Sequence, residues 1–230
     1  MREAPRQLAF DLPLDPRFGR EDFLVSPSNE LAYAQIESWP NWSDTILLLT
    51  GPRGSGKSHL AAIWAATAHA WTVDAFEITQ HKVPHLISNG ALAIEDVDRG
   101  DRDEAALFHL LNLAREKRAF VLLTSETPPD RWGLQTPDLL SRLRLAPVVS
   151  LGAPDDALLK AVLVKLFVDR QLVVDTSVVD YVALRIERSL AKADELVTML
   201  DKEALSRGRR VSRAMAADIL GAAQEMDEIE

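Results

Sequence analysis

Short, uninterrupted apolar runs alternate with amphipathic stretches through the first two thirds of the chain. The runs that predict strands cover residues 45–50, 71–74, 91–94, 120–124 and 147–151. Between them, residues 103–117 show the apolar spacing of an amphipathic helix. Runs without polar alternation are typical of parallel strands buried on both faces, and strands that alternate with helices form parallel sheets. The pattern therefore predicts an α/β fold with a five-stranded parallel sheet.

After Gly152 the pattern becomes helical only. Apolar residues recur at helical spacing over residues 158–167, 178–186 and 193–205. Gly208 is expected to cap the end of a helix, and Ser212 is expected to cap the start of a final one. We therefore expect an extended tail over residues 1–18, an α/β domain over 19–152 and a small all-helical domain over 153–230.

Composition narrows the function classes. The chain has 230 residues, 47% of them hydrophobic, and a formal net charge of −9. This charge argues against a protein that mainly wraps nucleic acid, because phosphate binding favours a basic surface. There is no cysteine, and the five histidines lack metal-ligand spacing. No apolar run is long enough to cross a bilayer and no signal peptide is recognisable, so we expect a cytoplasmic protein without a membrane partner.

A phosphate-binding motif follows the first predicted strand. It comprises Gly51, Pro52, Arg53, Gly54, Ser55, Gly56, Lys57 and Ser58, with His59 next in the helix that follows. Glycines at these positions let backbone N–H groups surround phosphate oxygens, and the helix start adds its positive dipole end. Lys57 would neutralise the β- and γ-phosphates, and the Ser58 hydroxyl would bind Mg²⁺. The alternative is a chance glycine-rich turn.

An acidic pair ends the predicted strand at residues 91–94. Carboxyl ends of parallel strands are where open α/β sheets place their ligands. Strand periodicity directs Glu95 and Asp96 to different sides, so Glu95 is expected near Mg²⁺ and Asp96 beside the attacking water. Asp98 replaces them if the register is shifted by one step. The alternative interpretation is a solvated acidic turn.

The order of these parts resembles the AAA+ ATPases. The chain carries IEDVD after the P-loop, then LLTSE, then LLSRLRL and a small helical domain, which the resemblance identifies as a lid. Within that class it resembles the initiator DnaA and, more closely, the short regulatory Hda family. The resemblance implies an adenine pocket walled by Phe23, Val25 and Asn29, and a sensor 1 residue at Glu126. It also implies an arginine finger at Arg142, with Arg144 the second candidate, whereas the alternative is that both arginines are surface charges.

The resemblance also assigns the first dozen residues. In regulators of this family a short N-terminal peptide docks on the DNA polymerase III sliding clamp (beta subunit). The stretch QLAFDL matches such a peptide, with contacts from Gln7, Leu8, Phe10 and Leu12. Independently, an extended segment bounded by prolines presents apolar side chains to a groove. The alternative is that Phe10 and Leu12 pack on the chain's own domain.

The sequence departs from the family pattern at several points. The metal site begins with Glu95 where an aspartate is usual, and Glu126 also replaces an aspartate. Asp194 stands where the lid arginine of sensor 2 is expected, and Arg188 is the candidate substitute. Residues 75–90 are too few for the extra helix with which initiators hold single-stranded DNA. The chain ends near the lid without a helix-turn-helix domain, so no strong direct DNA binding is expected.

Three functions follow from these observations. The first is a regulator of replication initiation that binds ADP or ATP with Mg²⁺, docks on the clamp and promotes ATP hydrolysis by DnaA through Arg142. Such a regulator has little turnover of its own and forms a homodimer or higher homo-oligomer. The second is a self-sufficient AAA+ ATPase that loads or remodels a replication protein. The third is a small P-loop kinase.

Overall fold

The computed structural model describes residues 18–227, and side chains as far as residue 221. The tail residues Gln7, Leu8, Phe10 and Leu12 therefore lie outside the described residues. The chain divides into two compact units between Ala153 and Pro154. We call them the α/β unit, residues 18–153, and the helical unit, residues 154–227.

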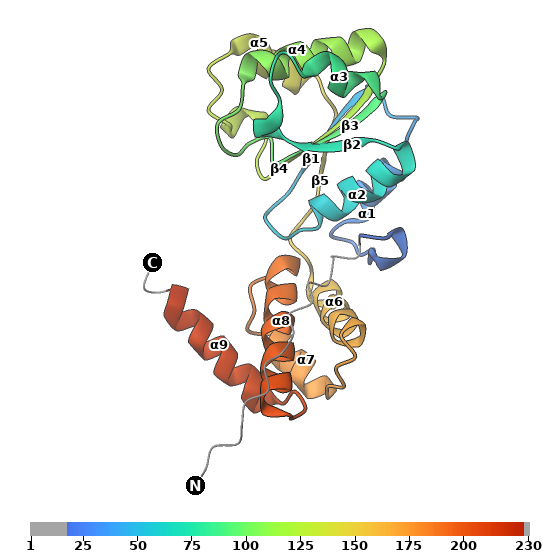
Figure 1. Cartoon of the computed structure of the whole chain (residues 1–230). Coiled ribbons are helices and arrows are strands. Elements are labelled where there is room, and N and C mark those ends of the chain that lie inside the picture. Colours follow the sequence, from blue (N-terminus) through green and yellow to red (C-terminus); the bar gives the residue numbers. More distant parts are fainter. Residues whose placement is uncertain (1–17, 228–230) are drawn as a thin grey trace. The chain divides into compact units, whose positions relative to one another are not determined.

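The α/β unit is built on five parallel strands in the order β2-β3-β4-β1-β5 (Figure 1). The strands are β1 (Ile46–Thr50), β2 (Trp71–Asp74), β3 (Ala91–Glu95), β4 (Phe120–Ser125) and β5 (Val148–Ser150). The sequence prediction of a five-stranded parallel sheet is confirmed. Each strand matches its predicted range to within one residue at either end. The central strands β1, β3 and β4 are buried, as their apolar runs predict, whereas the edge strands β2 and β5 are largely exposed.

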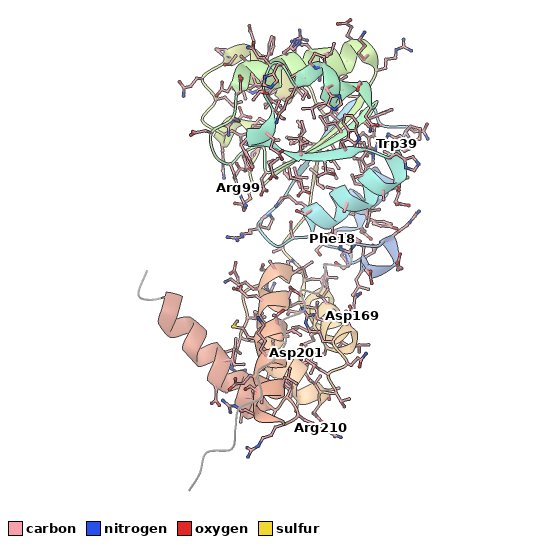
Figure 2. All side chains as sticks on the ribbon, viewed as in Figure 1. Phe18, Trp39, Arg99, Asp169, Asp201 and Arg210 are labelled. Atoms are coloured by element: carbon pink, nitrogen blue, oxygen red, sulfur yellow. The ribbon has the colours of Figure 1, made fainter. Side chains whose placement is uncertain are left out.

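Helices cover both faces of the sheet (Figure 1). α1 (Glu30–Glu37) and α2 (Lys57–Ala68) pack on the face that includes Leu47 and Leu49. On the face of Ile46 and Leu48 lie α3 (Val83–Ser88), α4 (Glu104–Lys117) and α5 (Pro137–Arg144). Short 3₁₀ turns occur at Arg20–Asp22, Ala75–Glu77 and Pro129–Arg131. Side chains fill the space between the layers (Figure 2), so β1 runs through two cores at once.

The segment between β2 and β3 contains one six-residue helix, α3, which no apolar periodicity had predicted. Its residues Val83, Leu86 and Ile87 are buried in the core beside α4. A helix this short covers the sheet and completes the core on that face. The longer helix α4 begins where predicted, with Asp103 accepting a hydrogen bond from the Ala106 N–H at 2.9 Å.

The helical unit comprises α6 (Asp156–Asp169), α7 (Thr176–Ala183), α8 (Leu190–Arg207) and α9 (Arg213–Asp227). Leu159, Leu163 and Phe167 of α6 are buried in its own core. α7 ends three residues before the predicted limit of residue 186. Both predicted caps are confirmed: Gly208 ends α8 at a φ of 57°, and the Ser212 hydroxyl accepts from the Met215 N–H at 3.3 Å. None of the described helices is both long and apolar enough to traverse a lipid bilayer.

Candidate nucleotide site

The candidate site lies at one edge of the sheet because the strands are parallel. β1, β3 and β4 all end there, and they lead into the glycine-rich turn 51–56, Asp96 and Glu126 respectively. Within the turn, Gly54 and Gly56 have φ values of 71° and 101°. Residues that carry a side chain rarely adopt this left-handed backbone region, so the turn depends on glycine at these two positions. These conformations direct successive backbone N–H groups into a concavity that suits phosphate oxygens.

Gly51 is required for a different reason. A Cβ atom at this position would lie 2.7 Å from the Leu151 carbonyl oxygen and 2.9 Å from the Ser55 hydroxyl oxygen. The backbone after β1 therefore runs against the backbone after β5, which leaves no room for a side chain. This close approach fixes where the glycine-rich turn begins.

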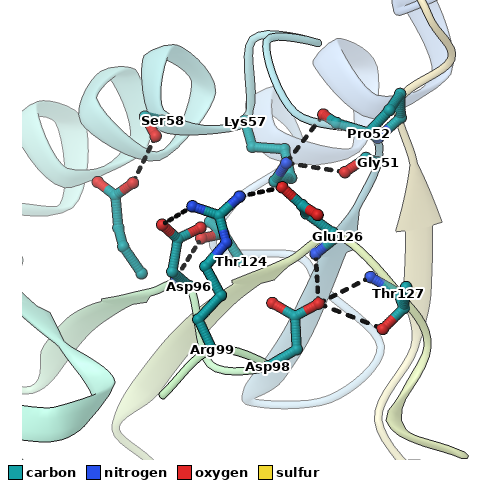
Figure 3. A network of polar contacts seen from close by, with 11 residues as sticks. Gly51, Pro52, Lys57, Ser58, Asp96, Asp98, Arg99, Thr124, Glu126 and Thr127 are labelled. Atoms are coloured by element: carbon teal, nitrogen blue, oxygen red, sulfur yellow. Dashed lines mark hydrogen bonds and ion pairs between the residues drawn. The ribbon is translucent and has the colours of Figure 1, made fainter. Parts of the chain in front are cut away.

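Lys57, the first residue of α2, is buried beneath this turn. Its ammonium donates hydrogen bonds to the carbonyl oxygens of Gly51 at 2.8 Å and Pro52 at 3.0 Å (Figure 3). Burial lowers the pKa of Lys57, although the nearby charges of Asp96 and Glu126 partly offset this. No carboxylate makes an ion pair with the ammonium among the described residues. A buried cation without an anionic partner fits a phosphate ligand.

Ser58 and Glu95 face each other across the start of α2 and the end of β3. The Ser58 hydroxyl donates to the Glu95 carboxylate at 2.5 Å. Within residues 18–227 there is no group of three His, Cys, Asp or Glu side chains that would hold a metal alone. Mg²⁺ commonly takes one or two protein oxygens and completes its shell with phosphate and water. This pair therefore fits Mg²⁺ carried by a nucleotide.

Asp96 points away from Glu95 and has an unusual backbone. Its φ is 51°, and its N–H donates to the Thr124 hydroxyl at 3.1 Å. Its carboxylate accepts a hydrogen bond from Arg99 at 3.0 Å. The two acidic residues therefore meet different partners. Because Asp96 follows β3 with a left-handed backbone, its direction comes from the turn and not from strand alternation.

Arg99 is the site residue that sequence reasoning missed. Its guanidinium binds Asp96 with one nitrogen and the Glu126 carboxylate with another (Figure 3). Partial burial acts to lower the pKa of Arg99, but the Glu126 hydrogen bond and the charge of Asp96 outweigh it and the pKa is raised. The only sequence signal is an arginine three positions after Asp96 in EDVDRG.

Asp98 has a structural position. One carboxylate oxygen accepts from the N–H groups of Glu126 at 2.8 Å and Thr127 at 3.0 Å, and from the Thr127 hydroxyl at 3.2 Å. Asp98 therefore holds the chain that leaves β4. Its other oxygen, Oδ1, is buried and has no hydrogen-bond partner among the described residues, so the alternative role of Asp98 as a metal or water ligand stays a prediction.

The residues expected around an adenine base differ in how far their side chains are buried. Phe23 is buried, stacks on Tyr33 at 5.5 Å between ring centroids and meets the His59 ring edge-on at 5.2 Å. The His59 ring also donates a hydrogen bond to the Gly19 carbonyl at 2.9 Å. Val25 is exposed. These contacts tie the chain before α1 to the first turn of α2.

Asn29 holds the loop itself. Its side-chain oxygen accepts from the Ser26 N–H at 2.8 Å, and its amide nitrogen donates to the Leu24 carbonyl at 2.9 Å. Both polar groups of this buried amide are thereby satisfied within the loop. Asn29 therefore shapes the wall through its hydrogen bonds within the loop.

The two arginines of α5 have different surroundings. Arg144 makes an ion pair with Asp130, with its Nε 3.0 Å from the carboxylate. Arg142 is exposed, and its side chain has no polar partner among the described residues. From α4, Arg115 approaches the Arg142 carbonyl oxygen at 3.5 Å. The guanidinium of Arg142 is therefore the one available to another molecule.

The sensor 2 candidates belong to the helical unit. Asp194 pairs with Arg170 at 2.8 Å, and the same Arg170 nitrogen donates to the Thr198 hydroxyl at 3.0 Å. Arg188 forms an ion pair with Asp156 at 2.8 Å, and both of these side chains are exposed. An aspartate at the expected arginine position is therefore neutralised by an arginine from the neighbouring helix.

Sequence comparisons connect the chain to replication initiators. No family model matches it. It is 22% identical over 209 residues to the chromosomal replication initiator DnaA of Clavibacter sepedonicus, covering 80% of this chain and 44% of that protein. The Crocosphaera subtropica DnaA is 24% identical over 195 residues, covering 74% of this chain and 43% of that protein. The chain thus spans about half the length of the curated relatives it matches.

Solved structures share the fold. Domain III of the Thermotoga maritima DnaA superposes with a TM-score of 0.75 at 20% identity, covering 91% of this chain and 97% of that one. A replication initiator DnaA bound to AMPPCP and single-stranded DNA gives 0.66 at 21% identity, covering 85% and 69%. The T. maritima RuvB branch migration motor gives 0.67 at 17% identity, covering 89% and 69%. The α/β unit therefore has the AAA+ P-loop fold, with similarity to the initiator domain.

Proposed function

We propose that this chain is a nucleotide-binding regulator of DNA replication initiation, which supplies Arg142 to ATP held by the initiator DnaA. The observation that carries the proposal is the contrast on α5, where Arg144 is paired with Asp130 and Arg142 is exposed and unpaired among the described residues. A guanidinium directed at a neighbour's γ-phosphate stabilises the charge that develops during transfer.

The chain's own nucleotide is proposed to be ADP or ATP with Mg²⁺. The glycine turn would bind the phosphates through backbone N–H groups, and Lys57 would neutralise them. Ser58 and Glu95 would hold the metal, while the aromatic contacts of Phe23 and His59 would wall the base. A related initiator structure contains AMPPCP, which supports an adenine nucleotide as the ligand.

The partners are proposed from the sequence pattern and the similarity to initiators. Gln7, Leu8, Phe10 and Leu12 would dock on the beta subunit of the DNA polymerase III sliding clamp. The initiator would receive Arg142, and copies of the chain would associate as a homodimer or larger oligomer. Strong direct binding of DNA is not part of the proposal, since the net charge of −9 opposes it.

A self-sufficient AAA+ ATPase is the second candidate. It is favoured by the presence in one chain of Ser58, Glu95, Asp96 and Glu126 at the same sheet edge. This set would hold a metal and direct a water without help from a neighbour. If the chain has this function, Arg142 would act on the nucleotide of another copy of the same chain.

The deciding experiment is reconstituted ATP hydrolysis by DnaA in the presence of clamp and DNA. Arg142→Ala is expected to abolish the stimulation while leaving ADP binding intact, because the arginine does not contact its own nucleotide. Arg144→Ala is the matched control and should retain stimulation, since Arg144 is already paired. Full stimulation by the Arg142 variant would contradict the proposal. Brisk ATP turnover by the wild-type chain alone, without stimulation of DnaA, would favour the second candidate.

Clamp docking needs its own measurement. The double change Gln7→Ala and Phe10→Ala should remove binding to immobilised clamp, because both the hydrogen-bonding amide and the central apolar anchor are lost. ADP affinity and melting temperature should be unchanged. A marked fall in melting temperature would instead indicate that these residues pack on the chain itself.

A further inference from the structure

Arg99 joins two carboxylates that come from different strands. Asp96 follows β3 and Glu126 follows β4, and each accepts from a different guanidinium nitrogen (Figure 3). The exposed fractions of these side chains are 44% for Arg99, 42% for Asp96 and 34% for Glu126. Solvent therefore reaches all three, and the bridge opens at the cost of two exposed ion pairs.

The backbones that carry the bridge are firmly held. The Arg99 N–H donates to the Asp96 carbonyl at 2.9 Å, which closes a tight turn directly after β3. The N–H of Val97, the residue after Asp96, donates to the Thr124 carbonyl of β4, also at 2.9 Å. On the other side, Asp98 holds the N–H of Glu126. Opening the bridge therefore requires side-chain rotation alone and leaves the sheet undisturbed.

The bridge also bears on the chemistry of the site. A carboxylate that positions or deprotonates water must offer a free oxygen to that water. Arg99 binds one Asp96 oxygen, which fixes the direction in which the other oxygen points, and it brings a positive charge beside Glu126. Ser58 and Lys57 are likewise engaged, with Glu95 and with turn carbonyls respectively. Lys57, Ser58, Asp96 and Glu126 are therefore all paired within the site, whereas the Ser55 hydroxyl and Oδ1 of Asp98 are buried without a partner among the described residues.

We infer that Arg99 is a positioning residue that locks Asp96 and Glu126 together and thereby slows ATP hydrolysis by the chain itself. This inference rests on the proposed nucleotide binding. It gives a physical reason for a chain that holds a nucleotide stably while its exposed Arg142 acts elsewhere. The Asp96 carboxylate can rotate toward an attacking water only when the guanidinium turns away.

The test compares single-turnover ATP hydrolysis by the full-length wild type and Arg99→Ala. The variant is expected to be roughly threefold to thirtyfold faster, the range expected from releasing two exposed ion pairs. Arg99→Lys should give a smaller gain, because one ammonium does not reproduce the two-nitrogen bridge. The matched control is Arg131→Ala, which removes an exposed arginine of the same unit that lies outside the network.

A second variant separates the lock from a structural role. In Arg99→Ala/Asp96→Asn the gain should disappear, because the released group is no longer a carboxylate. A rate in Arg99→Ala equal to or below the wild-type rate, with ADP affinity retained, overturns the inference alone. Absence of ADP binding by the wild type overturns the proposed function and this inference together. If Arg99→Ala does not fold, the Arg99→Lys rate decides: a gain supports the lock, and no gain overturns it.

Discussion

The Ser58 hydroxyl and the Glu95 carboxylate are joined by a hydrogen bond of 2.5 Å that links the start of α2 to the end of β3. An aspartate at position 95 would reach less far from the strand, whereas the longer glutamate side chain makes this contact. The two proposed metal ligands therefore already meet across the site.

We predict that Glu95→Gln separates metal binding from nucleotide binding. The amide oxygen still accepts from Ser58, but the negative charge that attracts Mg²⁺ is gone. ADP affinity measured by calorimetry in EDTA should match the wild type, and the gain in affinity on adding Mg²⁺ should be reduced. An undiminished effect of Mg²⁺ would mean that Glu95 does not serve the metal.

Lys57→Ala should lose ADP binding without unfolding the α/β unit. The buried ammonium bonds to two carbonyl oxygens of the glycine turn, and water can replace it in these bonds. We expect an affinity loss of at least roughly a hundredfold, which corresponds to about 3 kcal/mol for a charged contact. Lys117→Ala, at the exposed end of α4, is the control that should bind normally. Unchanged ADP affinity in Lys57→Ala would exclude this site.

Gly51→Ala should destabilise the α/β unit by about 1–3 kcal/mol, as overpacking does in other tight interiors. The new methyl group meets the Leu151 carbonyl oxygen at 2.7 Å, and a backbone atom moves only with its strand. Urea denaturation followed by tryptophan fluorescence measures the change. Gly221→Ala in α9 is the comparison, since nothing lies within 4 Å of its added Cβ and a helix favours alanine. It should be neutral or stabilising.

Asp44 should contribute stability that depends on pH. Burial acts to raise the pKa of Asp44, but its hydrogen bond and ion pair with Arg115 outweigh this, and the pKa lies below 3.8. A carboxyl whose folded pKa is depressed stabilises the fold above its unfolded pKa and loses that effect as pH falls through the folded one. The stability difference between wild type and Asp44→Asn should therefore be constant near neutrality and shrink below pH 3.8.

The control for this pH dependence is Asp101→Asn. Asp101 is exposed and has no ion pair with another described residue, so the same substitution should produce little difference at any pH. Urea unfolding at a series of pH values compares the two variants with the wild type. A difference for Asp44→Asn that does not change with pH would contradict the ion pair with Arg115.

Substitutions of Asp96 test whether the left-handed backbone after β3 is strained. Asp96→Gly and Asp96→Ala both remove the carboxylate, but only alanine is strained at a φ of 51°. The glycine variant should be more stable in urea denaturation by up to about 1 kcal/mol, after allowance for the extra freedom of glycine in the unfolded chain. Equal stabilities would show that the turn relaxes.

The sheet was predictable because its central strands β1, β3 and β4 are apolar runs, and the P-loop because its glycines and lysine have fixed spacing. The helix at Val83–Ser88 was not, since six residues give little periodicity and proline stands at its second position. Its formation depends on burial of Val83 and Leu86 beside α4, which is a tertiary effect.

The Arg99 bridge was equally beyond sequence patterns. Asp96 and Glu126 are separated by 30 positions along the chain and meet through the register of β3 and β4, in which Ile94 pairs with Leu123. The bridge also requires the positive φ of Asp96. Aspartate adopts this region more often than most residues, but the sequence does not indicate which aspartate of the turn does so. Asp98 shows the same limit, because its three donors lie on the chain that follows β4.

The central place of β1 has a consequence for biosynthesis. Its hydrogen-bonding neighbours are β4 and β5, so Thr50 pairs with Ser125 on one side and with Ser150 on the other. Both partners are synthesised after β1. At typical translation rates the 100 residues between Thr50 and Ser150 take roughly 5 to 20 s to emerge. Until β4 is made ILLLT has no partner on either edge, and until β5 is made it lacks one of the two. Apolar segments exposed in this way during synthesis are prone to aggregate.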